Sequence, residues 1–250
     1  MGQSTVVTGI VLYAAPIGEY DKRVVILTKE RGKITAFAKG ARRQNSSLIA
    51  AVNLFAFGEF ELYEGRSSYT IAKASIQNYF IELVNNFEGA YYGFYFMEFA
   101  DYYTRENNDE FMMLKLLYQS LKALAKDNIS NELIRCIFEL KAITINGEYP
   151  QVFQCQCCEK EENIIYFSTR LGGIVCSDCV KPEHVAIKIS NSTLYAMQFI
   201  ITSTIEKLFT FKVSAQVLEE LKTIMKKYIK VYIDKEFKSL PILDGIITAQ

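Results

Sequence analysis

The sequence predicts an α+β chain of more than one domain, with a small five-stranded barrel followed by a helical bundle that carries an inserted four-cysteine ribbon. Three observations predict this fold class. The hydrophobic period is two over residues 1–80, it changes to about 3.6 from Asn86 onward, and two CxxC pairs interrupt the helical pattern. We therefore expect one domain at residues 1–80 and a second at 81–250, with a metal-binding insertion at about 150–182.

Five runs of alternating or β-branched residues lie in the first 78 residues, separated by turn-forming stretches. After the third run a longer connection extends from Gly40 to Asn53, and we expect a short helix at Ser47–Val52 within it. Three strands, a helical connection and two more strands are typical of an OB-fold, a barrel that often binds oligonucleotides. The expected strands are Thr5–Tyr13, Arg23–Thr28, Lys33–Ala38, Phe55–Tyr63 and Tyr69–Ile76.

The remainder of the chain is predicted to be mostly helical. The expected helices end or begin at polar caps and at glycines, as at Gly147, which Pro150 closely follows. The pattern predicts helices at Glu88–Thr104, after Asn108-Asp109, from Ser130 to Gly147, at about Ser192–Phe209 and at Ala215–Phe237.

The composition indicates a globular protein of the cytoplasm. Half of the 250 residues are hydrophobic, so the chain can bury a real core. No apolar run approaches the roughly 20 residues that span a bilayer, and the first residues differ from a signal peptide. We therefore expect no membrane partner, and thiols that stay reduced and serve as metal ligands or buried core residues.

Charge is distributed unevenly along the chain, although the formal net charge is zero. Residues 1–80 hold ten lysines and arginines against six aspartates and glutamates, a net charge of +4, which leaves −4 for the remainder. A basic barrel domain favours a polyanionic partner. We expect one basic patch on the second and third strands and the following loop, formed by Lys22, Arg23, Lys29, Arg31, Lys33, Lys39, Arg42 and Arg43.

The strongest motif in the chain is a pair of CxxC sequences. Cys155 and Cys158 are separated by seventeen residues from Cys176 and Cys179, a spacing typical of a four-thiolate zinc ribbon. Four thiolates close the coordination shell, whereas a catalytic zinc keeps one position open for water. The sequence therefore predicts one structural Zn²⁺ and no catalytic metal.

Three other residues compete for a role at this site. Cys157 lies between two ligands and is left out of the set, because adjacent cysteines do not form the usual metal-binding turn. Cys136 falls among apolar residues of an expected helix and is interpreted as a small core residue. His184, the only histidine, is not needed to complete the shell and is interpreted as a surface residue.

At this point the sequence resembles a known family, the bacterial DNA-repair protein RecO. The matching segments are residues 18–33, which read GEYDKRVVILTKERGK, and residues 38–43, which read AKGARR. The helical body, the two CxxC pairs with the intervening Gly-Gly, and the length also match, so the resemblance covers nearly the whole chain.

The resemblance implies an OB-fold that binds single- and double-stranded DNA, a helical domain with a zinc module, and no catalytic centre. It also implies a bacterial, nucleoid-associated recombination mediator in DNA repair. With RecR, and in many bacteria RecF, such proteins anneal complementary strands and help RecA load onto DNA coated with single-strand-binding protein. The family binds the acidic, apolar C-terminal tail of that protein on its helical domain, where we expect a site near Lys222, Lys226 and Lys230, or otherwise only a solvated lysine face.

Two other functional classes are open to the residues alone. A zinc-dependent enzyme is disfavoured, because the chain has one histidine and lacks a Walker loop, GxSxG and HExxH. The alternative to the mediator is an OB-fold scaffold that has a structural zinc, binds only protein and has no role on DNA.

Overall fold

The computed structural model describes residues 4–66, 68–126 and 128–248. Their packing defines two compact units, one formed by residues 1–125 together with 237–250 and the other by residues 126–236. The first unit thus includes helices that follow the expected boundary at residue 80. A folding domain limited to residues 1–80 stays a prediction.

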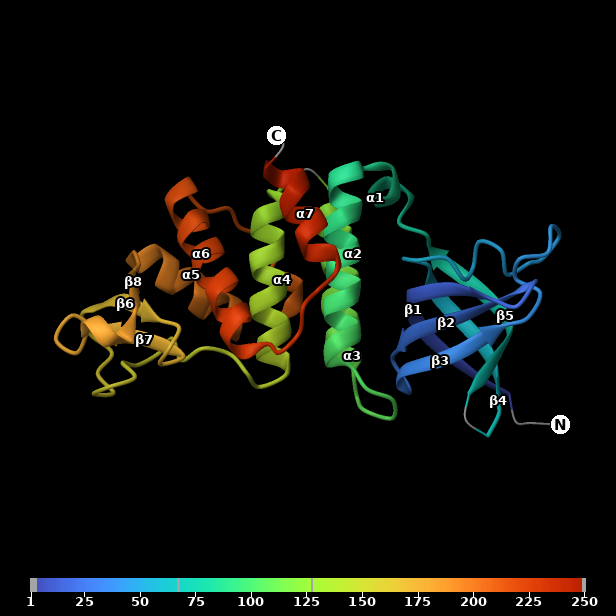
Figure 1. Cartoon of the computed structure of the whole chain (residues 1–250), viewed down its shortest axis with the longest axis horizontal. Helices are drawn as coiled ribbons and strands as arrows, with labels where there is room; N and C mark the ends of the chain where they lie inside the picture. Colours follow the sequence, from blue (N-terminus) through green and yellow to red (C-terminus); the bar gives the residue numbers. More distant parts are fainter. Residues whose placement is uncertain (1–3, 67, 127, 249–250) are drawn as a thin grey trace. The chain divides into compact units, whose positions relative to one another are not determined.

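The first unit begins with a closed barrel, and the expected five strands are all present (Figure 1). Their order around the barrel is β1-β2-β3-β5-β4, with β3 and β5 paired in parallel and all other pairs antiparallel. The OB-type barrel is confirmed. The strands are β1 (Ser4–Ile17), β2 (Asp21–Thr28), β3 (Gly32–Ala38), β4 (Phe57–Glu64) and β5 (Tyr69–Asn78).

Strand β1 closes the barrel because it pairs along both edges. Its first half pairs with β4 and its second half with β2, with a register shift between Val11 and Tyr13. Gly9 pairs with both Thr28 and Gly58 at the point where the two ladders overlap. A Cβ at Gly9 would lie 2.4 Å from the carbonyl oxygen of Leu27, so this close approach requires glycine.

The barrel interior is filled by inward-facing side chains such as Val24, Ile26, Ile34 and Phe60, which are at most 1% exposed. The connection after β3 closes one end of the barrel with four apolar side chains, from Ala41, Leu48, Val52 and Ala56. The connection has no regular secondary structure and reaches the core only through buried apolar side chains such as these, while most of its other residues are exposed.

The expected short helix at Ser47–Val52 was wrong. The segment is a series of turns. Its backbone hydrogen bonds are mainly of the i→i−3 type, as from Ile49 N to Ser46 O, and the bond from Val52 N to Leu48 O is of the i→i−4 type. The Ser46 side chain also accepts a hydrogen bond from the backbone N–H of Leu48 at 3.3 Å. A serine that bonds its own backbone locally competes with helix formation.

Among the residues that the structure describes, four helices complete the first unit; α2 packs against β1, and α3 packs against β1 and β2. The outward-facing Ile10 and Leu27 of these strands are therefore fully buried. Helix α7 was not expected. Its start is held by Glu98 of α2, whose carboxylate accepts hydrogen bonds from the backbone N–H groups of Lys238 and Ser239 at 2.9 Å each. The helices are α1 (Ile81–Asn85), α2 (Phe87–Tyr103), α3 (Phe111–Leu124) and α7 (Ser239–Thr248).

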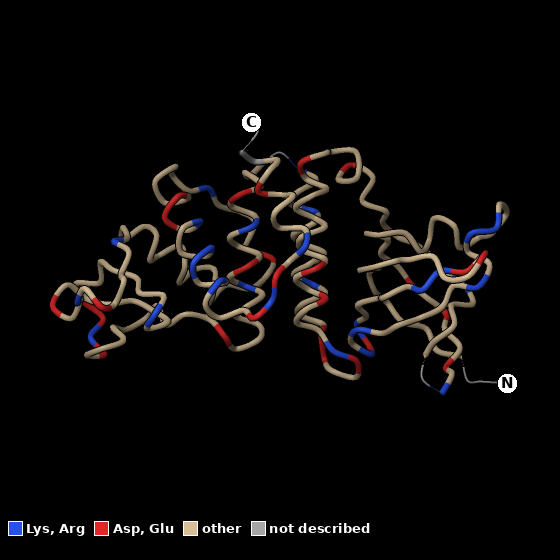
Figure 2. The backbone as a smooth tube through the Cα atoms, in the orientation of Figure 1, with Lys and Arg blue, Asp and Glu red and all other residues tan. Residues whose placement is uncertain are grey.

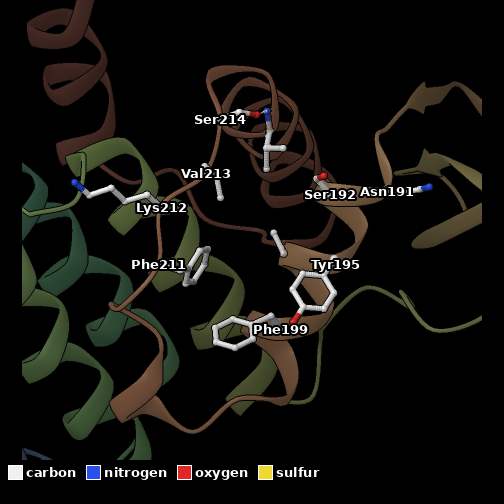
Figure 3. Close-up of a pocket in the computed structure, with 10 residues that line it drawn as sticks. Asn191, Ser192, Tyr195, Phe199, Phe211, Lys212, Val213 and Ser214 are labelled. Carbon is white, nitrogen blue, oxygen red and sulfur yellow. Dashed lines mark hydrogen bonds between the residues drawn. The ribbon is translucent and has the colours of Figure 1, made fainter.

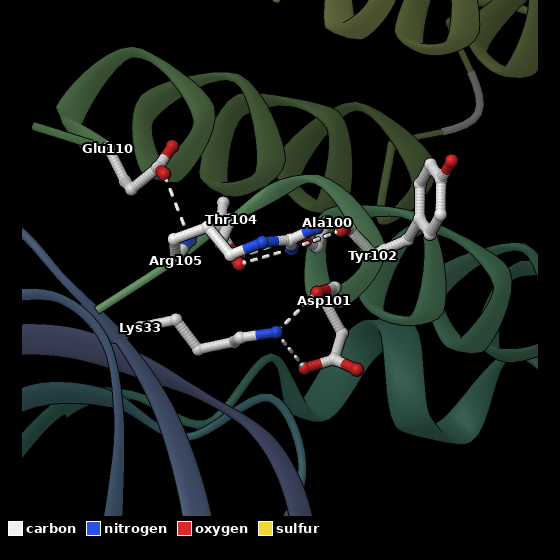
Figure 4. A network of polar contacts seen from close by, with 7 residues as sticks. All are labelled: Lys33, Ala100, Asp101, Tyr102, Thr104, Arg105 and Glu110. Carbon is white, nitrogen blue, oxygen red and sulfur yellow. Dashed lines mark hydrogen bonds and ion pairs between the residues drawn. The ribbon is translucent and has the colours of Figure 1, made fainter. Parts of the chain in front are cut away.

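The turn between β2 and β3 docks on the segment that follows α2. Gly32, at φ +63°, forms an antiparallel bridge with Glu106, and the backbone N–H of Lys33 donates to the carbonyl of Arg105 at 2.9 Å. Lys33 Nζ lies 3.0 Å from the Asp101 carboxylate, and Glu110 accepts from the Arg105 N–H at 2.9 Å (Figure 4). These contacts fix the barrel hairpin to the helices of the same unit.

In its described part, residues 126 and 128–236, the second unit combines three α-helices with a small sheet of order β7-β6-β8. The short 3-10 helices Pro182–His184 and Ile205–Lys207 connect its parts. The elements are α4 (Asn131–Ile145), β6 (Ile164–Ser168), β7 (Gly173–Cys176), β8 (Ala186–Lys188), α5 (Asn191–Thr202) and α6 (Ala215–Tyr232).

Two predicted helices end earlier than expected. The helix expected to reach Phe209 ends at Thr202, where the buried Lys141 ammonium binds the carbonyls of Ile201 and Ser203 at 2.8 and 2.7 Å. These carbonyls are thereby satisfied without a further helical turn. The helix expected to reach Phe237 ends at Tyr232, and the Phe237 ring packs on Phe99 of α2, with ring centroids 5.1 Å apart.

Within the part of the chain that the structure describes, no helix is both long and apolar enough to cross a membrane.

We predict that Gly32→Ala destabilises the protein by more than about 1 kcal/mol, because alanine is strained at positive φ and its Cβ would lie 2.2 Å from the carbonyl oxygen of Arg105. Thermal denaturation measures the change. Gly18→Ala is the matched control, since Gly18 has φ +57° but no atom within 4 Å of the place that the added methyl group would take. Equal losses in the two variants would contradict the docking of this turn.

Candidate nucleic-acid interface and metal centre

One end of the barrel gathers basic side chains from the start of β2 and from the loop after β3. The backbone N–H of Arg42 donates to the Tyr20 carbonyl at 2.8 Å, and the Arg42 guanidinium donates to the Glu19 carbonyl at 3.1 Å. The Asp21 carboxylate accepts from the Gly40 N–H at 2.7 Å. These bonds fix the loop after β3 against the β1–β2 turn, and Figure 2 shows basic positions on β2 and in the loop after β3.

We call this group the basic cluster, and its cations are largely available to a ligand. Arg23, Lys39, Arg42 and Arg43 are exposed, and Lys22 is half-buried. Burial, and secondly the charge of Arg42, lower the pKa of Lys22. The neighbouring acidic groups are Glu19 and Asp21. The basic cluster consists of Lys22, Arg23, Lys39, Arg42 and Arg43.

Two aromatic side chains accompany the basic cluster. The guanidinium of Arg43 lies 5.1 Å from the ring centroid of Tyr20, within cation–π range, and Tyr20 is 43% exposed. Arg23 of β2 pairs directly with Phe37 of β3, so the two side chains share the outer face of the barrel. Tyr20 was not among the expected site residues, although the sequence places it between Glu19 and Asp21, in the stretch between the first two expected strands.

The eight expected basic residues do not form a single patch, and DNA contact by these residues stays a prediction. Lys29, Arg31 and Lys33 lie at the opposite end of the β2–β3 hairpin, roughly 20 Å from Lys22 at about 3.3 Å per strand residue. Arg31 lies 3.5 Å from the Glu64 carboxylate, and Lys33 binds Asp101. Lys29 lies 5.7 Å from the ring centroid of Phe111. The alternation of strand residues predicts which face of the sheet a side chain occupies. It does not show how far apart along the hairpin two side chains on the same face lie.

The four predicted metal ligands come together in the second unit. The ligand atoms of Cys155, Cys158, Cys176 and Cys179 all lie within 4.8 Å of one another. Cys158 Sγ and Cys176 Sγ are 3.7 Å apart, close to the edge of about 3.8 Å of a tetrahedron with metal–sulfur bonds of about 2.3 Å. The arrangement therefore fits one tetrahedral metal ion.

Backbone pairing brings the two CxxC turns together. The N–H of Gln156 donates to the Ile174 carbonyl at 2.9 Å, which attaches the first turn to β7. The Cys155 Sγ accepts from the N–H groups of Cys176 and Cys157, both at 3.4 Å. The β6–β7 hairpin, in which Phe167 pairs with Ile174, places the second turn beside the first.

The thiols differ in their affinity for protons. Burial raises the pKa of Cys155, but hydrogen bonds from the backbone of Cys176, Cys157 and Cys158 outweigh it and bring the pKa to about 6. Side-chain contacts with the sulfurs of Cys158 and Cys176 raise the pKa of Cys179. A metal cation would compensate the negative charge that opposes ionisation of the fourth thiol.

The three competing residues stay outside this cluster. Cys157 is exposed and does not belong to the four clustered ligands, and Cys136 is 2% exposed in α4, where burial raises the pKa of its thiol. His184 Nδ1 accepts a hydrogen bond from the Lys181 N–H at 3.2 Å. Its imidazole thereby stabilises a 3-10 turn.

A groove of about 640 Å³ opens between α5 and the segment that precedes α6. Figure 3 shows the rings of Tyr195, Phe199 and Phe211 around the same space, and the Phe199 and Phe211 centroids are 5.2 Å apart. Tyr195 is 68% exposed, and Lys212 also lines the groove. We call this the aromatic groove.

The three lysines expected to attract an acidic tail lie on α6. Lys222 is paired with both Glu132 and Glu219, so its charge is already compensated. Lys226 and Lys230 are exposed.

The barrel fold, the basic cluster and the four-cysteine cluster together define a class of protein. It is a multidomain OB-fold protein with a basic barrel end and a thiolate metal cluster in its helical part. Two family descriptions cover nearly all of the chain: "Recombination protein O N terminal" matches residues 1–80, and "Recombination protein O C terminal" matches residues 84–241. The chain therefore belongs to the RecO family of DNA repair proteins.

Curated relatives agree with this assignment. The chain is 34% identical over 240 residues to the DNA repair protein RecO of Alkaliphilus metalliredigens, covering 95% of this chain and 98% of the relative. It is 32% identical over 237 residues to that of Acetivibrio thermocellus, with 94% of each chain covered. With the RecO of Clostridium novyi it shares 30% identity over 236 residues, 94% of this chain and 91% of the relative.

We predict that the purified protein contains one metal ion per chain and that Cys176→Ser abolishes binding and lowers the melting temperature, because three thiolates leave the shell open. Elemental analysis of the purified protein gives the metal content. Cys157→Ser is the matched control and keeps the ion. Loss of the ion in the control, or its retention in Cys176→Ser, would contradict this ligand set.

Proposed function

We propose that the protein is a DNA-binding recombination mediator. The single observation that carries this proposal is the basic cluster, which the β1–β2 turn and the loop after β3 hold at one end of an OB-type barrel. OB-folds bind single strands through a basic groove and exposed aromatic rings, and Tyr20 and Phe37 accompany these cations. Membership of the RecO family supports DNA as the polyanion.

The proposed binding is independent of base sequence. Arg42 and Arg43 neutralise phosphates, which releases counterions and makes the affinity sensitive to salt. The same charge neutralisation lowers the repulsion between two complementary strands and so promotes annealing. We infer that both single- and double-stranded DNA bind to the basic cluster.

The protein is proposed to act by binding, without a catalytic step of its own. In this proposal it cooperates with RecR, and with RecF where that protein is used, to load RecA onto DNA coated with single-strand-binding protein in the bacterial nucleoid. In this proposal the four-cysteine cluster only stabilises the fold of the second unit. Its ion is Zn²⁺, since a tetrahedral four-thiolate shell suits zinc.

The aromatic groove is the proposed site for the acidic, apolar C-terminal tail of single-strand-binding protein. Its rings from Tyr195, Phe199 and Phe211 suit apolar side chains, and Lys212 in its lining suits a carboxylate. We prefer this groove to a site at Lys222, because the Lys222 ammonium is already paired with Glu132 and Glu219.

We predict that Arg42→Ala combined with Arg43→Ala lowers the affinity for single- and double-stranded oligonucleotides regardless of base sequence. Loss of two phosphate contacts reduces the salt slope by about 1.4 for single strands. Fluorescence anisotropy titrations at several salt concentrations measure both quantities.

The matched control removes two cations from the other end of the hairpin, with Arg31→Ala and Lys33→Ala. Because these residues are paired with Glu64 and Asp101, the DNA affinity and the salt slope change little. Wild-type binding by the Arg42/Arg43 variant would contradict the proposal and favour a protein-binding scaffold. Annealing of strands precoated with single-strand-binding protein then tests mediation, and the same variant loses it.

We predict that Tyr195→Ala weakens binding of a peptide with the sequence of the cognate tail by about tenfold, since a buried aromatic contact contributes more than about 1 kcal/mol at such sites. Isothermal titration calorimetry measures the affinity. Lys222→Ala leaves the affinity within about twofold. The combined Lys226→Ala and Lys230→Ala variant tests the α6 lysine face, and a larger loss there than in Tyr195→Ala would reject the aromatic groove.

A further inference from the structure

A second groove, of about 670 Å³, opens in the first unit next to the basic cluster. Its lining includes four large apolar side chains that are at least 37% exposed, which is unusual clustering for a surface. They come from three parts of the chain, the connection before β4, the residue that follows β5 and helix α1. These side chains are Leu54, Tyr79, Ile81 and Val84.

The floor of this groove is aromatic, and one of its residues has a strained backbone conformation that the surrounding structure imposes. Phe55 has φ +69°, a conformation that a bulky residue adopts only when its surroundings impose it. Its backbone N–H donates to the Val11 carbonyl at 3.3 Å, and its ring stacks on Phe94 of α2 with centroids 5.3 Å apart and an interplanar angle of 19°. The floor is therefore rigid before any ligand binds.

One end of the groove is polar and belongs to the basic cluster. Lys22 lines the groove, and its Nζ donates to the Asn53 side-chain oxygen at 2.8 Å. The backbone N–H of Arg42 donates to the carbonyl of Tyr20, two residues before Lys22, and the charge of Arg42 lowers the pKa of Lys22, so a phosphate placed here would meet two cations. The groove thus leads from a cationic end to an apolar, aromatic interior.

We propose that this groove receives an unpaired nucleobase of single-stranded DNA, stacked on Tyr79 at the rim above the Phe55–Phe94 floor, while the adjoining phosphate binds Lys22 and Arg42. The proposal rests on the proposed DNA binding and adds a base-binding subsite to it. The amide of Asn53 provides hydrogen-bonding groups for a base edge.

A nucleic-acid strand fits this surface better than an apolar protein segment, because the cationic end is continuous with the basic cluster. A base has two apolar faces and a charged backbone attached to it, which matches a groove that is apolar inside and cationic at one end. A base in a duplex stays paired and stacked. The groove therefore makes the protein prefer single strands, whereas the remainder of the basic cluster binds both forms.

Anisotropy titrations with a labelled oligothymidine and with a blunt duplex of equal length test the proposal on the full chain. Tyr79→Ala is expected to lower the affinity for the single strand about fivefold or more, the effect of one lost base–aromatic contact, and to leave the duplex affinity within about twofold. Tyr79→Phe keeps the ring and is expected to keep single-strand affinity.

A direct measurement uses an oligonucleotide that contains 5-iodouracil, which is photo-crosslinked to the protein and mapped by mass spectrometry. Crosslinks at Tyr79 or Phe94 support the subsite, and crosslinks confined to Tyr20 or Phe37 overturn it. An equal loss for single strand and duplex in Tyr79→Ala, or no loss for either, also overturns it.

The two proposals fail in different ways. If the Arg42/Arg43 variant loses DNA binding while Tyr79→Ala binds both DNA forms normally, the mediator proposal holds and the base subsite is rejected. Loss of RecR binding in Tyr79→Ala with unchanged DNA binding would instead identify the groove as a protein-docking surface. If the wild-type protein binds no DNA, both proposals are rejected.

Discussion

The two-sided pairing of β1 is the constraint on which the rest of the first unit depends. A single strand forms ladders with β4 and β2, and the overlap at Gly9 leaves no space for a side chain. Closure of the barrel follows from this pairing and protects both edges of β1. It also brings the β1–β2 turn beside the loop after β3, where hydrogen bonds from Arg42 to Tyr20 and Glu19 join them. The basic cluster thus results from the barrel topology.

Cations of one chemical type have different roles in this protein according to what surrounds them. Lys33 and Lys141 bind main-chain carbonyls, and so stabilise the end of α2 and the end of α5. Arg42 combines a structural bond to a carbonyl with an exposed charge. Cations at the surface, such as Arg43, retain much of their hydration and can exchange it for a phosphate. Net charge alone therefore does not locate an anion site.

Much of the fold was predictable because local patterns determine it. Alternation predicted the five strands, and the CxxC spacing predicted the ligand cluster, since each pair is a self-contained turn. The termini of α5 and α6, and helix α7, depend on contacts between distant residues. Lys141 lies 60 residues before Ile201, and Glu98 holds a helix start 141 residues later. No local pattern contains that information.

The sites were predictable only in part for the same reason. The sequence identified the basic residues one by one. The length of the hairpin separates Lys22 from Lys29, and the alternation pattern, which predicts only the face of the sheet, does not reveal that distance. Both grooves were missed. The floor of one depends on a positive φ at Phe55, and the other joins Tyr195 to Phe211 across a chain reversal. A non-glycine residue at positive φ has no sequence pattern that distinguishes it.

The central claim is that DNA binds at the end of the barrel formed by the β1–β2 turn and the loop after β3. Amide hydrogen exchange of the protein with and without a bound oligonucleotide tests this most directly, since it reports each segment separately. We predict slower exchange at residues 18–23 and 39–45 and unchanged exchange at residues 29–33. Protection of residues 29–33 without protection of the other two segments would contradict it.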